Sequence, residues 1–396
     1  MSHIISFQID GLAGREETYA KKLNRDVNIF FGLNGSGKTS LLRILHSAMF
    51  NDTKVLHSVP FKRAEVDIYT VAYQKAITRT IDKGTKVSMD TKKHRTDPLH
   101  AKVHSINEID QVVGSPKKEL KWITKGAPAE GKIGRWRHIY LPTWRLYTVS
   151  EAFPTFGLEA RPISVEREYE WDEFFGKQLE GIWSKYNNEM LSSISKIQAE
   201  GLAGILRTVL TAKSSTKRDR RITDIDLSKI YKRVSAFLER QGTPGVLGSI
   251  KGFSQRYNED VRVQKAVAAI TSTEEKIEKA MAPRRELEKQ IERMFTGNKK
   301  LVFKDTGITV ESEEGDEIPL GSLSSGEKHL MWILIQTLLA ADNTLMIDEP
   351  EISMHIDWQG DVISAMRHLN PKAQIIMATH SPSIMAMVPD DKIFRL

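Results

Sequence analysis

The sequence contains no cysteine, and other absences narrow further what the chain can be. Without cysteine, disulfide bonds and thiolate metal sites are excluded, and nothing argues for an oxidising compartment. The longest mainly apolar stretch, from Leu330 to Ala341, is too short to cross a bilayer, which takes about 20 residues. The chain does not open with a basic segment followed by an apolar one, so no secretory signal is expected. We therefore predict a cytoplasmic protein without a membrane segment.

Two kinds of catalytic cluster are also missing. The sequence has no histidines grouped like metal ligands and no set of serine, histidine and aspartate that would make a hydrolytic triad. With 396 residues, of which 40% are hydrophobic, the chain can form one large α/β domain with an inserted lobe, or two to three ordinary domains. Its net charge of +7 is moderate.

The segment GLNGSGKT, from Gly32 to Thr39, matches the complete phosphate-binding loop pattern. An apolar run that predicts a strand precedes it, and KTSLLRILHSAM follows with leucines at helical spacing. The glycines would let backbone N–H groups face phosphates, Lys38 would reach the β- and γ-phosphates, and Thr39 would offer its hydroxyl to Mg²⁺. The flanking strand and helix favour this interpretation over a glycine-rich turn without function.

A serine-rich turn precedes the long apolar helix. In LSSGE, the backbone N–H groups of Ser324, Ser325 and Gly326 would stand open at a helix start, where they favour an anion such as a γ-phosphate. An ordinary helix cap explains the same residues, so this segment alone leaves both interpretations open.

Two carboxylates follow an apolar strand. Leu345, Met346 and Ile347 predict a buried parallel strand that ends at Asp348 and Glu349, where open α/β sheets bind ligands. Asp348 is placed to orient Mg²⁺, and Glu349 to act on the attacking water as general base. Such a pair can also be a mere helix cap, but the phosphate loop in the same chain favours catalysis.

The motifs GLNGSGKT, LSSGEKH, TLMIDEPE and ATHSP follow one another in this order. They resemble the Walker A, signature, Walker B and switch-histidine motifs of ABC-type ATPases. The form IDEPEISMHIDWQ is similar to the AAA15 and OLD-like ATPases of prokaryotic anti-phage defence, such as the ATPase subunits of Septu and PARIS systems. The resemblance covers residues 1–50 and 297–396 well. It implies ATP and Mg²⁺ as cofactors, and a homo-oligomer, a head-to-tail dimer or larger, in which two heads enclose ATP.

The resemblance also assigns roles to single residues. Glu349, His380 and Lys38 are the expected catalytic residues, with His380 at the γ-phosphate, and Thr39 and Asp348 are the expected metal ligands. Nucleotide binding is expected from the phosphate loop in cis and from the signature of a neighbouring subunit in trans. The residues are Gly32, Asn34, Gly35, Ser36, Gly37, Lys38, Thr39 and Ser40 in the loop, and Ser324, Ser325, Gly326 and Glu327 in the signature.

The expected fold class is α/β: an ABC-type P-loop ATPase head, with a mixed sheet and flanking helices, and an inserted, mainly helical lobe. We assign residues 1–160 and 297–396 to the two parts of the head and residues 161–296 to the lobe. At the start, Ile5, Phe7 and Ile9 predict a strand with one apolar face. In the lobe, Pro283 predicts a helix break, after which a dozen residues reach about 18 Å. That length excludes the long coiled-coil arms of chromosome-structuring ATPases.

Residues 81–140 and 201–240 carry an excess of lysine and arginine. The first stretch contains Trp122 and Trp136, and the second contains KSSTKRDRR at residues 213–221. Basic side chains with interleaved aromatic rings can bind nucleic acid, so DNA binding is possible. Solvated loops with two packed tryptophans are the alternative.

Three classes of function compete. The first is an ATPase that serves as sensor and scaffold in anti-phage defence and controls a separately encoded effector, a nuclease or toxin, because the chain has no second catalytic cluster. The second is a DNA-repair or recombination ATPase of the compact SMC-like type, against which DEPEISMH argues. The third is a transporter nucleotide-binding domain. The long segment 40–323 between the motifs, and Glu327 where transporters usually have glutamine, argue against it.

Overall fold

The computed structural model describes residues 2–83, 120–126, 136–143, 168–211, 224–240 and 242–396, and, within these, no side chains at 168–172, 208–211 and 224–226. Contacts divide the chain into one unit of residues 1–162 and 340–396 and a second of residues 163–339. Each unit is described by itself. Residues 297–339, which we expected in the head, fall in the second unit because their strands and helix pack on its long helices.

The first unit contains a parallel sheet in the order β13-β3-β12-β11-β7. Its inner strands are almost entirely buried and apolar, as expected for a sheet covered on both faces. The strands are β3 (Val27–Phe31), β7 (His138–Leu141), β11 (Thr344–Asp348), β12 (Gln374–Thr379) and β13 (Ile393–Arg395). Their carboxyl ends share one edge, from which the phosphate loop, the carboxylates and His380 continue.

An antiparallel sheet in the order β2-β1-β4-β5-β6 completes this unit. The strands are β1 (His3–Asp10), β2 (Thr18–Lys22), β4 (Arg63–Thr70), β5 (Lys75–Asp82) and β6 (Ile123–Lys125). In β1 the buried residues are Ile4, Phe7 and Ile9, and Ile5 is only half-buried. The pairing with β4 shifts register between Ile4 and Ser6, and such a bulge reverses the side-chain alternation that the sequence predicted.

Helix α1 (Lys38–Phe50) contacts strands of both sheets, and its leucines join the main core of the unit. Helices α8 (Ile356–Leu369) and α9 (Pro382–Met385) follow β11 and β12. Three short 3-10 turns complete the described elements of the unit: η1 (Leu12–Gly14), η2 (Lys54–Leu56) and η5 (Asp390–Lys392).

Both tryptophans of the first basic stretch are buried in this core. The Nε1 of Trp122 donates to Ser47 Oγ at 2.9 Å, and the guanidinium of Arg79 lies 3.9 Å from the ring centroid of Trp136. These rings are therefore packed side chains and not a surface for stacked bases. The basic residues at 84–119, 127–135 and 213–221 lie outside the described residues.

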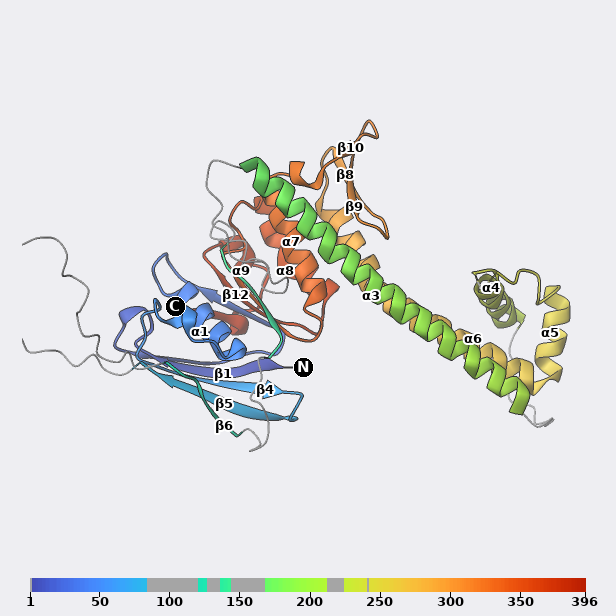
Figure 1. Ribbon diagram of the computed structural model, residues 1–396, viewed down its shortest axis with the longest axis horizontal. Coiled ribbons are helices and arrows are strands. Elements are labelled where there is room, and N and C mark those ends of the chain that lie inside the picture. Colours follow the sequence, from blue (N-terminus) through green and yellow to red (C-terminus); the bar gives the residue numbers. More distant parts are fainter. Residues whose placement is uncertain (1, 84–119, 127–135, 144–167, 212–223, 241) are drawn as a thin grey trace, which may run out of the picture. The chain divides into compact units, whose positions relative to one another are not determined.

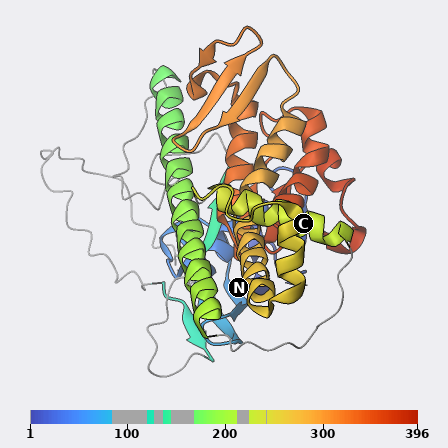
Figure 2. The same cartoon turned by 90° about the vertical axis from the view of Figure 1, so that its right-hand side faces the viewer.

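The second unit is built on two long antiparallel helices, α3 (Glu168–Thr211) and α6 (Val261–Met294). Figures 1 and 2 show them side by side. The predicted break at Pro283 is wrong, because α6 continues through it. An interior proline costs a helix about 3 kcal/mol, but α6 is buried on both sides of the proline, at Thr273 and at Leu287. The helix is therefore about 51 Å long, and the reach of 18 Å was an underestimate.

Beyond the ends of this pair lie two smaller groups of elements. Helices α4 (Asp224–Arg240) and α5 (Ile250–Glu259) pack on α6 around Phe237 and Phe253. After α6 come β8 (Lys299–Phe303), β9 (Ile308–Ser312) and β10 (Glu317–Ile318), then η4 (Leu320–Ser322) and α7 (Ser325–Leu339). Among all described residues, no helix is long and apolar enough to cross a membrane.

Candidate nucleotide site

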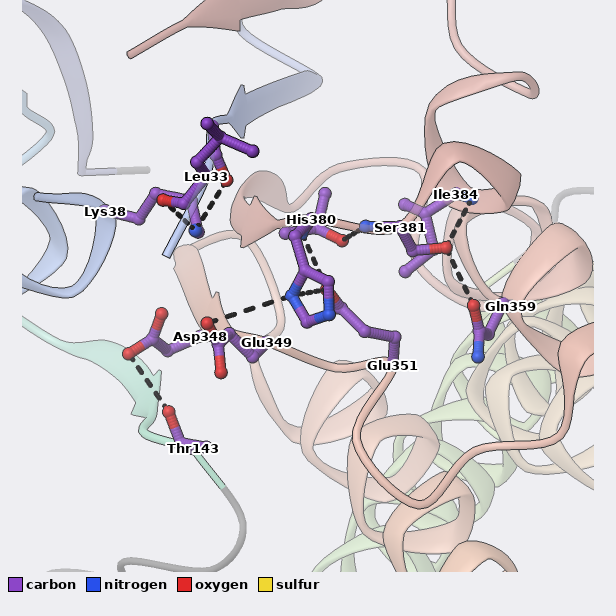
Figure 3. Close-up of polar contacts among 12 residues, drawn as sticks. Leu33, Lys38, Thr143, Asp348, Glu349, Glu351, Gln359, His380, Ser381 and Ile384 are labelled. Carbon is purple, nitrogen blue, oxygen red and sulfur yellow. Dashed lines mark hydrogen bonds and ion pairs between the residues drawn. The ribbon is translucent and has the colours of Figure 1, made fainter. Parts of the chain in front are cut away.

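The phosphate loop lies between β3 and α1 and has the backbone that its glycines permit. Gly35 and Gly37 have φ of 81° and 99°, in the left-handed region. A Cβ on Gly37 would lie 2.8 Å from the Cβ of Ala13, so a side chain there would clash as well as strain the backbone. Inside the loop, the buried Lys38 Nζ donates to the carbonyl oxygens of Gly32 at 2.7 Å and Leu33 at 3.2 Å (Figure 3).

Thr39 and Asp348, the expected metal ligands, are brought together from residues far apart in the chain. Thr39 Oγ1 donates to Asp348 Oδ2 at 2.7 Å, and Thr143 Oγ1 donates to the same oxygen at 3.3 Å. Asp348 Oδ1 is buried and has no hydrogen-bond partner among the described residues. Burial, with the neighbouring charge of Glu349, raises the pKa of Asp348 to about 6. A cation would satisfy both the free oxygen and the buried charge.

Glu349 leaves the strand with a strained backbone. Its φ is 51°, and its N–H donates to the Ala378 carbonyl of β12 at 2.8 Å. This left-handed residue redirects the chain after β11, so that Glu349 lies beside the phosphate loop while Asp348 stays buried. Strain at one residue thus separates the positions of two consecutive carboxylates.

Glu351 is a site residue that the sequence analysis did not assign. Its Oε1 accepts from the backbone N–H of His380 at 2.7 Å and lies 2.9 Å from His380 Nδ1, whereas Glu349 Oε1 lies 3.9 Å from the same nitrogen (Figure 3). Glu351 is 7% exposed, and its Oε2 is buried with no partner among the described residues. The signal in the sequence was that DEPE contains a third carboxylate after Asp348 and Glu349. Thr143 was also missed, because nothing in the surrounding sequence YLPTWR shows that this side chain faces Asp348.

A cavity of about 350 Å³ unites most of the expected residues of the first unit. It is lined by Asn34, Gly35, Gly37, Lys38, Thr39, Glu349, Ile352 and His380. Gly32, Ser36 and Ser40 belong to the same loop and helix start but do not line the cavity. The cavity therefore has a cationic amine, backbone donors, a hydroxyl, a carboxylate and an imidazole around one space, which suits a polyphosphate and an attacking water.

The signature residues lie in the second unit and form a capping box at the start of α7. Ser324 N–H donates to Glu327 Oε2 at 2.6 Å, and Glu327 N–H donates to Ser324 Oγ at 3.3 Å. Burial acts to raise the pKa of Glu327, but the bonds from Ser324 and the charge of Lys299, 3.3 Å away, hold it below its usual value. Ser324 and Ser325 are exposed and Gly326 is buried. The cap is thus present, and a role toward a neighbour's phosphate remains a prediction.

Comparisons with known proteins cover parts of the chain. The family described as "AAA domain, putative AbiEii toxin, Type IV TA system" matches residues 211–386. The Septu protein PtuA of Bacillus thuringiensis is 30% identical over 110 residues, which are 24% of this chain and 28% of that protein. The Retron Vc95 probable ATPase of Vibrio cholerae serotype O1 biovar El Tor is 27% identical over 94 residues, 20% of this chain and 18% of that protein.

Solved structures of Smc head domains align with nearly the whole chain but only loosely. The head with an extended coiled coil from Pyrococcus furiosus has a TM-score of 0.43 at 11% identity, covering 98% of this chain and 92% of that one. The head from Thermotoga maritima has a TM-score of 0.40 at 10% identity with the same coverage.

The chain spans less than a third of the length of the curated sequence relatives it matches, PtuA and the retron ATPase. Taken with the motif order and the family match, the sequence relatives show that this chain resembles the ATPases of anti-phage defence systems.

Proposed function

We propose that the chain binds and hydrolyses ATP in a Mg²⁺-dependent reaction. One observation carries this proposal: Thr39 Oγ1 meets Asp348 Oδ2 at 2.7 Å beside a cavity that Lys38, Glu349 and His380 also line. A hydroxyl and a carboxylate held together beside a phosphate loop are the donor set for a nucleotide-bound magnesium ion.

The residues present fit Mg²⁺, because Asp348 keeps one buried oxygen without a partner. Thr39 and Asp348 would hold the ion. When bound, Mg²⁺ neutralises charge on the phosphate oxygens.

The other cavity residues divide the remaining work. Lys38 would exchange its two loop carbonyl partners for the β- and γ-phosphates, since its amine is already buried inside the loop. Glu349 would take a proton from the attacking water, and His380 would donate to the γ-phosphate. Asn34 and Gly35 would bind phosphate through the loop.

We propose that Ser324, Ser325 and Gly326 complete the ATP site of a second copy, so that the active form is a head-to-tail dimer or a larger assembly. Support comes from the exposure of the two serines at the start of α7, where N–H groups and the helix dipole favour an anion.

In the cell, we propose that ATP turnover regulates a separately encoded effector, a nuclease or toxin, in cytoplasmic anti-phage defence. The support comes from two relatives, one named as a Septu protein and the other as a probable retron ATPase. A Mg²⁺-dependent phosphate-release assay on the purified chain tests the ATPase. Co-purification from the native host tests the role: a bound nuclease or toxin supports defence.

A DNA-repair ATPase of the compact SMC-like type is the second candidate. The observation that favours it is the length of α6, about 51 Å, because the sequence argument against helical arms depended on a break at Pro283. DNA ends or a recombinase in the co-purified material would support this function instead.

A further inference from the structure

The three-stranded sheet of the second unit, orange in Figure 2, has an open edge at β8. The strand order is β10-β9-β8, and β8 pairs with β9 alone among the described strands. An open edge presents backbone donors and acceptors on which another strand can be added.

The ladder shows which backbone groups face outward. Lys304 N–H donates to the Gly307 carbonyl at 2.8 Å, so the next pair, Phe303 and Ile308, is a non-bonded pair of the antiparallel ladder. In a non-bonded pair, both residues direct their N–H and C=O groups away from the partner strand. Since bonded and non-bonded pairs alternate, Phe303, Leu301 and Lys299 all direct these groups away from β9. Two contacts agree: Arg284 Nη2 donates to the outward Phe303 carbonyl at 2.8 Å, and Ser312, opposite Lys299, donates instead to the Asp316 carbonyl at 2.9 Å.

A cavity of about 760 Å³ runs along this edge. All five residues of β8 line it, together with the end of α6 and part of β9. Because consecutive strand residues point to opposite faces, a cavity that touches all five is not confined to one face and also reaches the outer edge of β8. Its lining includes the half-buried Leu301 and the buried residues Ile291 and Phe295.

The rim of the cavity is acidic in a chain whose net charge is +7. Glu292 and Glu313 are exposed and Glu311 is half-buried. Lysines on an edge strand commonly block strand addition, but the Nζ of Lys299 is held 3.3 Å from Glu327 Oε2. The other lysine of β8, Lys300, is exposed, and the glutamates of the rim favour a basic ligand.

We propose that β8 binds an extended, basic segment of the effector protein by strand addition. This proposal rests on the proposed function, because it assumes that the chain has an effector protein as its partner. The backbone groups of Leu301 and Lys299 would pair with the segment. Its apolar side chains would lie against the half-buried Leu301, and its lysines or arginines would face Glu292 and Glu313.

The test uses a displayed library of 12-residue peptides selected on the full-length chain, followed by the most enriched peptide in synthetic form. We expect enriched peptides to alternate β-branched with basic residues. Leu301→Pro removes one outward N–H and leaves the bonds to β9 intact, so it should weaken peptide binding at least tenfold, whereas Leu301→Val should not. A peptide N-methylated at alternate positions should lose binding to the same degree.

Charge and hydrogen exchange give independent readings. Glu292→Lys with Glu313→Lys should weaken binding at least tenfold at low salt. The matched pair of changes, Glu180→Lys with Glu189→Lys at exposed positions of α3, should not. Bound peptide should slow exchange of the Leu301 amide. No enriched peptide, or binding that Leu301→Pro leaves intact, would overturn the proposal. ATP hydrolysis is measured on every variant: turnover that persists while peptide binding fails rejects the docking edge alone, and absent turnover in the unmodified chain rejects the proposed function.

Discussion

One carboxylate oxygen of Glu351 contacts both the backbone nitrogen and the Nδ1 of His380, at 2.7 and 2.9 Å. With Nδ1–H donated to a carboxylate, Nε2 is the ring nitrogen available to the cavity that His380 lines. Glu351 does not line that cavity itself. It is therefore a positioning residue, and it acts on the γ-phosphate only through His380.

This relationship predicts the kinetics of Glu351 variants. Glu351→Ala should lower kcat about tenfold with little change in KM, because orientation of His380 is lost and ATP contacts are kept. Glu351→Gln, which keeps one acceptor oxygen, should recover part of the loss. The decisive measurement is the double variant: in a His380→Ala background, Glu351→Ala should lower kcat no further. Additive losses would mean that Glu351 acts on structure or catalysis by another route.

Glu349→Gln should bind ATP and lose turnover by a factor on the order of 10² to 10⁴, because the general base is removed while the shape of the side chain is kept. Phosphate release and nucleotide binding measured on the same preparation check both parts. We expect the ATP-bound assembly to accumulate. Turnover within threefold of the unmodified protein would show that another group activates the water.

Two inactive subunits should restore activity when mixed. Lys38→Ala disables the phosphate loop and Ser324→Arg blocks the signature, so a head-to-tail pair contains one site with neither change. Because Ser324 caps α7, its variant is first checked by thermal unfolding. We expect ATP hydrolysis to rise above that of either subunit alone, and no rise in verified mixed oligomers would contradict sites shared in trans.

A half-buried histidine pair predicts a pH dependence of stability. His46 Nδ1 and His138 Nε2 lie 2.7 Å apart; burial lowers the pKa of His46 to about 3 and that of His138 to about 4. Since the unfolded chain takes up these protons below about pH 6.5 and the folded chain does not, stability should be full above that pH and fall toward pH 4. At pH 5 the loss is on the order of 2 kcal/mol per histidine.

Urea unfolding at pH 7.5 and pH 5 measures this loss. His46→Gln should remove roughly half of the pair's contribution to the difference between the two pH values. His57→Gln, at an exposed position after η2, is the matched control and should leave the difference unchanged. An equal effect of the two substitutions would show that the pair of His46 and His138 does not cause the pH dependence.

Local patterns were sufficient to predict the elements that carry the motifs. The strand before the phosphate loop, the helix after it and the strand that ends at Asp348 all lie where the apolar pattern predicted them. These segments are continuous apolar runs in a buried parallel sheet, so their local and tertiary preferences agree.

The features that the sequence did not reveal depend on contacts between distant residues. Pro283 reads locally as a helix end, yet packing of α6 keeps the helix intact. Glu351 reaches His380 from the turn between β11 and α8, in which Glu349 and Ser353 adopt positive φ of 51° and 65°. Glutamate and serine rarely adopt a positive φ, so the sequence pattern could not have predicted where the Glu351 side chain lies.

The proline inside α6 also removes one backbone hydrogen bond from that helix at a defined residue. Pro283 has no N–H, so the carbonyl of Lys279 loses its helical partner, and one bond fewer resists bending there. Next to the proline, Arg284 binds Glu288, Asp305 and the Phe303 carbonyl, which fixes the side of the helix that leads into β8. From Pro283 to Val261 the helix extends about 33 Å, so a bend of about 5° would displace its far end by about 3 Å. A small change of backbone angle at Pro283 would thus produce a larger displacement at Val261, the far end of α6.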